Sequence, residues 1–193
     1  MQIYLKSIRR YTGASETACD ETYVLVFVVR AGAVSSANTI LYGPWDDPSS
    51  GRTGMLFYGP GGLPLVPPPN IWCFGDKPEP APDPDEIIIL AALMENEDGE
   101  PSALREMLHA RMLEELASAP PGLARDDLTQ RLLRRMREAL RCPVTIGALN
   151  SDDLIDIGEI SIRHALQARL PTIVSTLMTG SAGHYDLFFE IAP

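Results

Sequence analysis

Short runs of β-branched and aromatic residues dominate the pattern of hydrophobic positions along the chain, and such runs are typical of strands. Residues 20–30 and 86–94 are apolar at nearly every position between their polar ends. Because a strand without polar alternation buries both of its faces, we expect these two segments in the interior. Residues 2–8 instead alternate apolar and polar side chains, which predicts a half-buried first strand.

Other strand candidates are shorter, and turn residues separate them along the chain. Strand-like composition occurs at residues 55–58, 71–74, 144–146, 157–162, 171–178 and 185–191. Turns are predicted at residues 42–48, 59–64 and 150–156, and the proline-alternating stretch 77–84 predicts a stiff connector. A tally of about seven or eight strands with turns between them favours a mainly β fold, an antiparallel β-sandwich.

The hydrophobic period changes to that of a helix after residue 100. Leucines and methionines three and four positions apart predict one amphipathic helix over 102–118 and a second that ends at Cys142 and Pro143. Either Asp126 or Asp127 is the predicted N-cap of the second helix. The short connection between the helices predicts an antiparallel hairpin. We therefore expect a single β-sandwich domain over 1–193, with residues 101–142 as a helical hairpin insert.

Composition and charge narrow the class of protein. The 193 residues carry a formal net charge of −10, which argues against a nucleic-acid binder because such proteins need a basic surface. The three cysteines stand far apart and form no CxxC pair, so the spacing excludes a zinc ribbon. Neither a signal-peptide core nor a membrane-length apolar run occurs. We expect a soluble cytoplasmic protein, or one that is exported without an N-terminal signal.

Three groups of acidic residues flank the predicted strands. They are Asp20 and Glu21; then Glu95, Glu97, Asp98 and Glu100; then Asp152, Asp153 and Asp156. If the strands are antiparallel neighbours, all three groups fall on one rim of the sandwich. Calcium takes six to eight oxygen ligands, and a bound cation would relieve the repulsion between such carboxylates. The candidate calcium ligands are Asp20, Glu95, Glu97, Asp98, Asp152 and Asp153. The alternative is that these are ordinary solvated loop acids.

The acidic motifs also carry a family resemblance. A strand introduced by Asp20, Glu21 and Tyr23, a strand that ends in the motif at 94–98, and the later Asp-Asp-Leu-Ile at 152–155 together resemble C2-like β-sandwich domains. In such domains, acidic loops at one end of the sandwich often hold calcium. The resemblance thus implies the same fold as the strand pattern and a calcium-binding rim.

The second predicted helix is rich in arginine. It carries Arg125, Arg131, Arg134, Arg135, Arg137 and Arg141, out of 16 lysines and arginines in the chain. The simpler interpretation is a solvated helix face that balances acids elsewhere. The other is a docking surface for an acidic protein or an anionic membrane, with Arg131, Arg134, Arg135 and Arg137 as the partner-binding residues.

Signals for catalysis are weak. His109, His164 and His184 form no HExxH motif, and the chain contains no GxSxG. We therefore expect no enzyme, but a binding module with an acidic, calcium-binding rim that docks to a protein or membrane surface. Two alternatives stay open: a structural or effector component of a larger bacterial assembly, such as a toxin or injection apparatus, and a metal-dependent hydrolase. The sequence leaves the partner and the oligomeric state undetermined.

Overall fold

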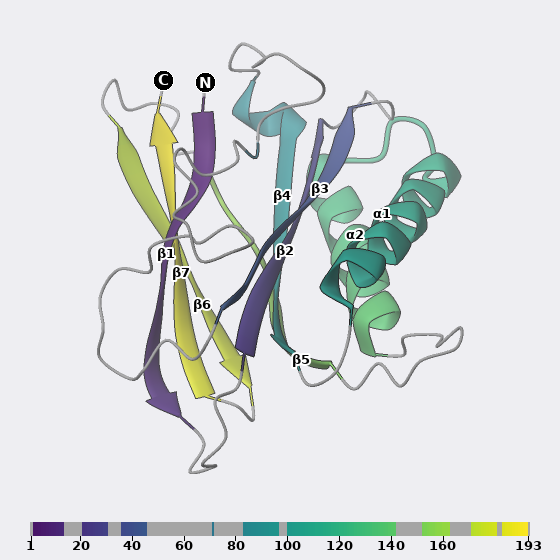
Figure 1. The fold of residues 1–193 in the computed structure, drawn as a ribbon. Helices are drawn as coiled ribbons and strands as arrows, with labels where there is room; N and C mark the ends of the chain where they lie inside the picture. The colour runs from purple at the N-terminus through teal and green to yellow at the C-terminus, as the bar shows by residue number, and fades with distance from the viewer. Residues whose placement is uncertain are drawn as a thin grey trace.

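A computed structural model describes residues 2–13, 21–30, 36–45, 71, 83–96, 100–141, 152–162, 171–180 and 183–192. Its elements are β1 (Gln2–Gly13), β2 (Glu21–Arg30), β3 (Ala37–Trp45), the 3-10 turn η1 (Pro84–Glu86), β4 (Ile87–Asn96), α1 (Pro101–Ser118), α2 (Arg125–Arg141), β5 (Asp153–Glu159), β6 (Thr172–Gly180) and β7 (Gly183–Ala192). The strands form two antiparallel sheets, with orders β1-β7-β6 and β3-β2-β4-β5. The helices cover the second sheet on the face turned away from the first (Figure 1). The predicted β-sandwich with an inserted helical hairpin is confirmed.

The four-stranded sheet is the middle layer, and this position explains the two continuous apolar runs. In β2, Val24 and Val26 point into the core shared with the three-stranded sheet, whereas Leu25 and Phe27 point into the core beneath the helices. The side chains of β4 likewise point alternately into the two cores. Since neighbouring residues of a strand face opposite sides, only a strand between two apolar layers has no polar position.

The helices bury the predicted leucine and methionine stripes against this sheet. The buried residues are Leu104, Leu108, Met112 and Leu116 in α1, and Leu128, Leu132, Met136 and Leu140 in α2. The predicted N-cap of α2 was wrong, because the helix begins at Arg125 and the N–H of Leu128 donates to the carbonyl of Ala124 at 2.9 Å. Asp126 and Asp127 lie in the first turn instead, where a carboxylate still interacts favourably with the helix dipole.

Arg125 fixes the start of α2 to the sheet. Its Nε and Nη2 donate to the carbonyl of Ile87 at 3.0 and 2.8 Å, and its Nη2 also lies 2.6 Å from Oε1 of Glu159. The arginine side chain is 12% exposed. A largely buried, charge-assisted contact of this kind joins the hairpin to β4 and β5 at once.

Two turn predictions were wrong in part. The turn predicted over residues 42–48 is wrong as far as Trp45, because β3 continues to that residue, which pairs with Thr22. Residues 46–48 lie outside the described residues. Pro44 is tolerated there because β3 is an edge strand with one side free of ladder bonds. The acidic turn at 150–156 is also wrong from Asp153 onward, because those residues pair with β4 as part of β5. The strands predicted at 55–58, 72–74 and 144–146 lie outside the described residues.

β5 and β6 approach closely along one side of the sandwich. A Cβ at Gly180 would lie 2.5 Å from the carbonyl oxygen of Ile155, so glycine is required at this contact. The N–H of Thr179 donates to Oδ2 of Asp156 at 2.9 Å. The two sheets are therefore tied together through the ends of these strands.

Candidate functional site

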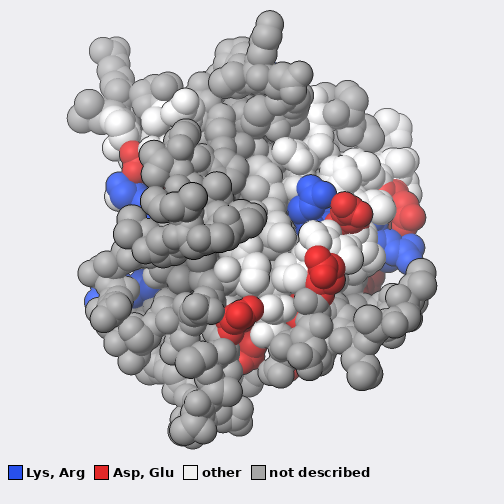
Figure 2. All heavy atoms as spheres, in the orientation of Figure 1, with Lys and Arg blue, Asp and Glu red and all other residues white. Residues whose placement is uncertain are grey.

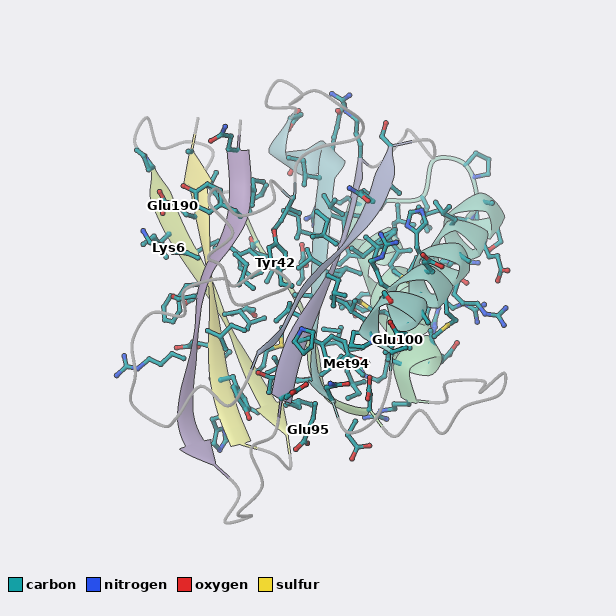
Figure 3. The ribbon with its side chains drawn as sticks, viewed as in Figure 1. Lys6, Tyr42, Met94, Glu95, Glu100 and Glu190 are labelled. Carbon is teal, nitrogen blue, oxygen red and sulfur yellow. The ribbon has the colours of Figure 1, made fainter. Side chains whose placement is uncertain are left out.

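Members of each of the three acidic groups, Glu21, Glu95 and Asp153, lie at one end of the middle sheet, whereas Glu100 lies at the start of α1. The strand registers place Glu95 opposite Thr22 on one side and opposite Asp153 on the other. Glu21 lies opposite Asn96 at the same end. Figure 3 shows Glu95 at the lower end of β4, beyond Met94. The pairing of β2, β4 and β5 therefore brings Glu21, Glu95 and Asp153 to the same end of the sheet, and the predicted rim of all three groups stays a prediction.

This rim is divided between the two faces of the sheet. Thr22 and Glu95 follow the alternation of residues that point to the three-stranded sheet, and Asp153 shares their face because it pairs with Glu95. Asp152 instead contacts Tyr23, which belongs to the core beneath the helices. The predicted ligands Glu95 and Asp153 thus share one face, and Asp152 lies on the other.

Asp152 is the most buried carboxylate of the rim. It is 4% exposed, and its Oδ2 accepts a hydrogen bond from the hydroxyl of Tyr23 at 2.7 Å. Burial, together with this carboxylate, raises the pKa of Tyr23 far above its usual range. The pair joins the start of β5 to β2, two strands away in the sheet. This contact accounts for an acidic residue at a position with almost no access to solvent.

Two oxygen atoms at the rim are buried without a hydrogen-bond partner in the described part of the chain. They are Oγ1 of Thr22 and Oδ1 of Asn96. The amide nitrogen of Asn96 is engaged, because Nδ2 donates to Oε2 of Glu21 at 2.8 Å. Buried oxygens of this kind are usually satisfied by a water or a ligand.

The calcium site stays a prediction. Among the described residues, no group of three or more His, Cys, Asp or Glu side chains is arranged to hold a metal ion. Asp20, Glu97 and Asp98, three of the six predicted ligands, lie outside the described residues. Of the predicted ligands that the structure describes, Glu95 and Asp153 lie on one face of the sheet. A cation at the rim would bind these two carboxylates together with Asp20, Glu97 and Asp98.

The arginines of α2 fall into two sets, of which the first faces α1. Arg131 forms an ion pair with Glu115 and donates from Nη2 to Oγ of Ser118 at 2.9 Å. Arg135 lies 3.3 Å from Glu114 through Nη2. These arginines, which were predicted to bind a partner, therefore hold the two helices of the hairpin together.

The second set lies on the outer face of α2 and is called the outer arginine stripe. It consists of Arg134, Arg137 and Arg141, whose spacing of three and four places them on one helix face. Arg134 and Arg141 are exposed and Arg137 is partly exposed. In the part of the chain that the structure describes, none of the three forms an ion pair. Arg134 and Arg137 belong to the predicted partner-binding set, whereas Arg141 was outside it.

The exposed face of α1 differs from this stripe. Arg105 pairs with Glu106 at 3.4 Å, and Arg111 pairs with Glu114 at 3.1 Å. Figure 2 shows basic and acidic side chains next to one another on the side of the molecule where the helices lie. The charges of α1 therefore compensate one another locally, whereas no described carboxylate forms an ion pair with the outer arginine stripe.

Thr39 of β3 contacts His109 of α1. The sequence did not predict this contact, because it did not predict β3. Oγ1 of Thr39 lies 2.9 Å from Nδ1 of His109, beside a cavity of about 300 Å³ between β3 and α1. Burial and the nearby Arg105 lower the pKa of His109. Thr39 is only 1% exposed, so its hydroxyl is closed to a substrate. The pair joins the edge of the sheet to α1.

Comparisons with known proteins give no further guide: the chain matches no family model, no curated protein and no solved structure. The resemblance to C2-like domains therefore stays a prediction. No helix in the described ranges is long and apolar enough to cross a membrane.

Proposed function

We propose that this protein is a non-enzymatic interaction module that docks an acidic protein segment on the outer arginine stripe. The observation that carries the proposal is the contrast within α2. Arg125, Arg131 and Arg135 have carboxylate partners inside the molecule, while Arg134, Arg137 and Arg141 present their charge outward.

The charge of the whole chain makes this contrast significant. With a net charge of −10, the protein has a surplus of carboxylates that would neutralise arginines placed at random. Three arginines on one helix face have no ion pair with a described carboxylate, and together with the neighbouring Glu138, which pairs with Arg135, they leave a local region of net positive charge. Such a region steers an acidic segment to one place on the surface, and the planar guanidinium group binds carboxylates in a bidentate manner.

The contacts that hold α2 against the sheet and against α1 support a rigid docking surface. Arg125 fixes the helix start to β4 and β5, and the ion pairs of Arg131 and Arg135 fix its middle to α1. A partner then meets guanidinium groups on a helix that is already held in place. Preorganisation of this kind reduces the entropy lost on binding.

An acidic protein segment fits the stripe better than an anionic membrane does. The apolar face of α2 is buried against the sheet, from Leu128 to Leu140, so the helix has no hydrophobic residues to insert among lipids. Basic residues near an anionic membrane contribute about 1 kcal/mol each, or about 3 kcal/mol for the stripe. An extended anionic surface also repels the rest of an acidic protein, whereas a peptide meets only the stripe.

The test measures binding of a fluorescein-labelled oligoglutamate peptide by fluorescence anisotropy at low and at physiological salt. We expect the triple variant Arg134→Gln, Arg137→Gln and Arg141→Gln to bind at least about tenfold more weakly than the wild type. Arg111→Gln is the control, because it removes a charge from the paired face of α1, and it should change the affinity less than about twofold.

Two outcomes would contradict the proposal. Equal affinity of the triple variant and the wild type would show that the peptide binds elsewhere. Binding to phosphatidylserine vesicles that depends on the stripe, without binding to the peptide, would identify a membrane as the partner instead.

A further inference from the structure

Among the described strands, four lie at the edges of the two sheets: β1 and β6 in one sheet and β3 and β5 in the other. An edge strand presents unpaired N–H and C=O groups to any other strand that it meets. Proteins usually protect such edges with charged residues, with proline or with a covering element. How each edge is protected therefore indicates which of them is open to another chain.

β1 and β3 are protected. The N–H of Ile71 donates to the carbonyl of Ile3 at 2.6 Å, which occupies part of the β1 edge, and β1 also carries the exposed Lys6. In β3, the carbonyl of Thr39 accepts a hydrogen bond from Nη1 of Arg105 at 3.4 Å, because α1 packs over this strand.

β5 is protected by charge and by contacts. It carries Asp153, Asp156 and Glu159 within seven residues. Asp156 accepts the N–H of Thr179, and Glu159 binds Arg125 of α2 at 2.6 Å. A strand with this density of carboxylates repels a second copy of itself.

β5 covers β6 at its C-terminal end, where the N–H of Thr179 donates to Asp156, but the rest of the strand has no protection by charge or by proline. Thr172–Gly180 contains no charged residue and no proline. Its outer side chains include Ile173 and Leu177, which are 53% and 58% exposed and are the large exposed hydrophobic residues of the described chain. Ser175 lies between them and is also exposed. An uncharged, apolar edge is unusual unless another strand pairs with it.

The backbone of β6 presents the same three residues to the edge. The N–H of Thr179 points away from β7, since it donates to Asp156 in the other sheet. Backbone groups alternate along a strand, so those of Ile173, Ser175 and Leu177 also point away from β7. In the described part of the chain, these three have no hydrogen-bond partner for the outward groups.

We propose that β6 pairs antiparallel with β6 of a second copy of this chain, so that the two three-stranded sheets become one continuous sheet. The register is centred on Ser175, which lies opposite the same serine of the other copy. Ile173 of each copy then lies opposite Leu177 of the other. The residues with outward backbone groups meet as hydrogen-bonded pairs, and the four apolar side chains cover one another on the outer face.

Charge favours a second copy as the occupant. With a net charge of −10 on each chain, most pairs of faces repel when two copies meet. β6 brings no charge to the contact, and the acids of β7 beside it are matched within the sheet. Glu190 lies 2.6 Å from Lys6 (Figure 3), and Asp186 lies opposite Arg9. The apolar stripe of one copy therefore fits the same stripe of the other without an unbalanced charge between them.

The experiment measures the mass of the full chain in solution by sedimentation equilibrium over a range of concentrations. We expect the wild type to rise from 21.1 kDa toward twice that mass as the concentration increases. The variant with Ile173→Lys and Leu177→Lys should stay monomeric, and so should the variant with Ile173→Glu and Leu177→Glu. An equimolar mixture of the two variants should recover the dimer, because each lysine then lies opposite a glutamate.

The mixture keeps the test independent of misfolding, since variants that had lost their fold would not recover a dimer of defined mass. A wild type that stays monomeric at every concentration would overturn the proposal and leave the edge to a different partner. A dimer that persists in the lysine variant would place the contact on another face, and a mixture that stays monomeric would refute the register. Because β6 lies on the other sheet from α2, none of these results depends on peptide binding by the outer arginine stripe.

Discussion

Replacing Tyr23 with phenylalanine removes one oxygen atom and tests the buried pair at the rim. The ring of Tyr23 is fully buried in the core beneath the helices, and phenylalanine fills almost the same volume. The change therefore deletes the hydrogen bond to Asp152 with little effect on packing. Asp152 is left in a buried position with one donor fewer.

The expected cost at neutral pH follows from the type of hydrogen bond. The donor is a neutral hydroxyl and the acceptor is a carboxylate 2.7 Å away. Hydrogen bonds to a charged group contribute about 1.5–3 kcal/mol, so Tyr23→Phe should lower the free energy of unfolding by about 2 kcal/mol at pH 7.

At alkaline pH the difference in the free energy of unfolding between the wild type and Tyr23→Phe should become smaller. The folded state raises the pKa of Tyr23 above its ordinary value of 10.0, first through burial and then through Asp152. A raised pKa stabilises the fold fully below pH 10, and that contribution is lost as the pH rises further, because only the unfolded chain releases the proton. The loss is about 1.4 kcal/mol per pH unit for each such tyrosine. The free energies of unfolding of Tyr23→Phe and the wild type should therefore become equal within about 1.5 pH units above pH 10.

The assay is guanidinium unfolding of both proteins at several pH values from 7 to about 11.5. Tyr42→Phe is the matched control, since burial also raises the pKa of Tyr42 but no carboxylate takes part. Tyr42→Phe should reduce the loss of unfolding free energy above pH 10 by the same amount as Tyr23→Phe. At pH 7 it should lower the free energy of unfolding by only about 1 kcal/mol. Parallel curves for wild type and Tyr23→Phe at all pH values would refute the argument.

Two further predictions concern the hairpin and the rim. Arg125→Met should lower the free energy of unfolding by about 2 kcal/mol, because Ile87 and Glu159 lose a shared charged donor. Arg134→Met, on the exposed face, should stay within about 0.5 kcal/mol of wild type, as measured by guanidinium unfolding at pH 7. A calcium site at the rim predicts a rise of several degrees in the melting temperature in millimolar calcium relative to chelator, about 2.7 kcal/mol at a hundredfold excess over Kd. Melts that are identical in chelator, magnesium and calcium would leave Glu95 and Asp153 as solvated acids.

The parts of the fold that follow from local patterns were predictable from the sequence. β2 and β4 were recognisable because two apolar layers remove every polar position from a central strand. The helices were recognisable because each buries one stripe against one sheet. β3 was missed because it lies at an edge, where Gly43 and Pro44 give a turn signal that the strand tolerates.

The candidate sites depend on register and on partners that are distant in sequence. That Glu95 and Asp153 are neighbours follows from the pairing of β4 with β5 across the whole hairpin, which no local pattern specifies. The burial of Asp152 depends on Tyr23, 129 positions earlier in the chain. The division of the arginines into two sets depends on where Glu114 and Glu115 lie on α1. Periodicity locates the arginine-rich helix, and only the packed structure shows which of its arginines form ion pairs with the described carboxylates.

The position of β2 and β4 between two cores has a consequence for how this protein can diverge. From Val24 to Val29 and from Ile87 to Met94, successive side chains pack in alternate cores, so a polar replacement on either face would be buried without a partner. The helices and outer strands each keep a solvent face that can vary. Relatives that share this fold should therefore be recognised by two uninterrupted apolar segments of seven or eight residues, even where every surface residue has been replaced.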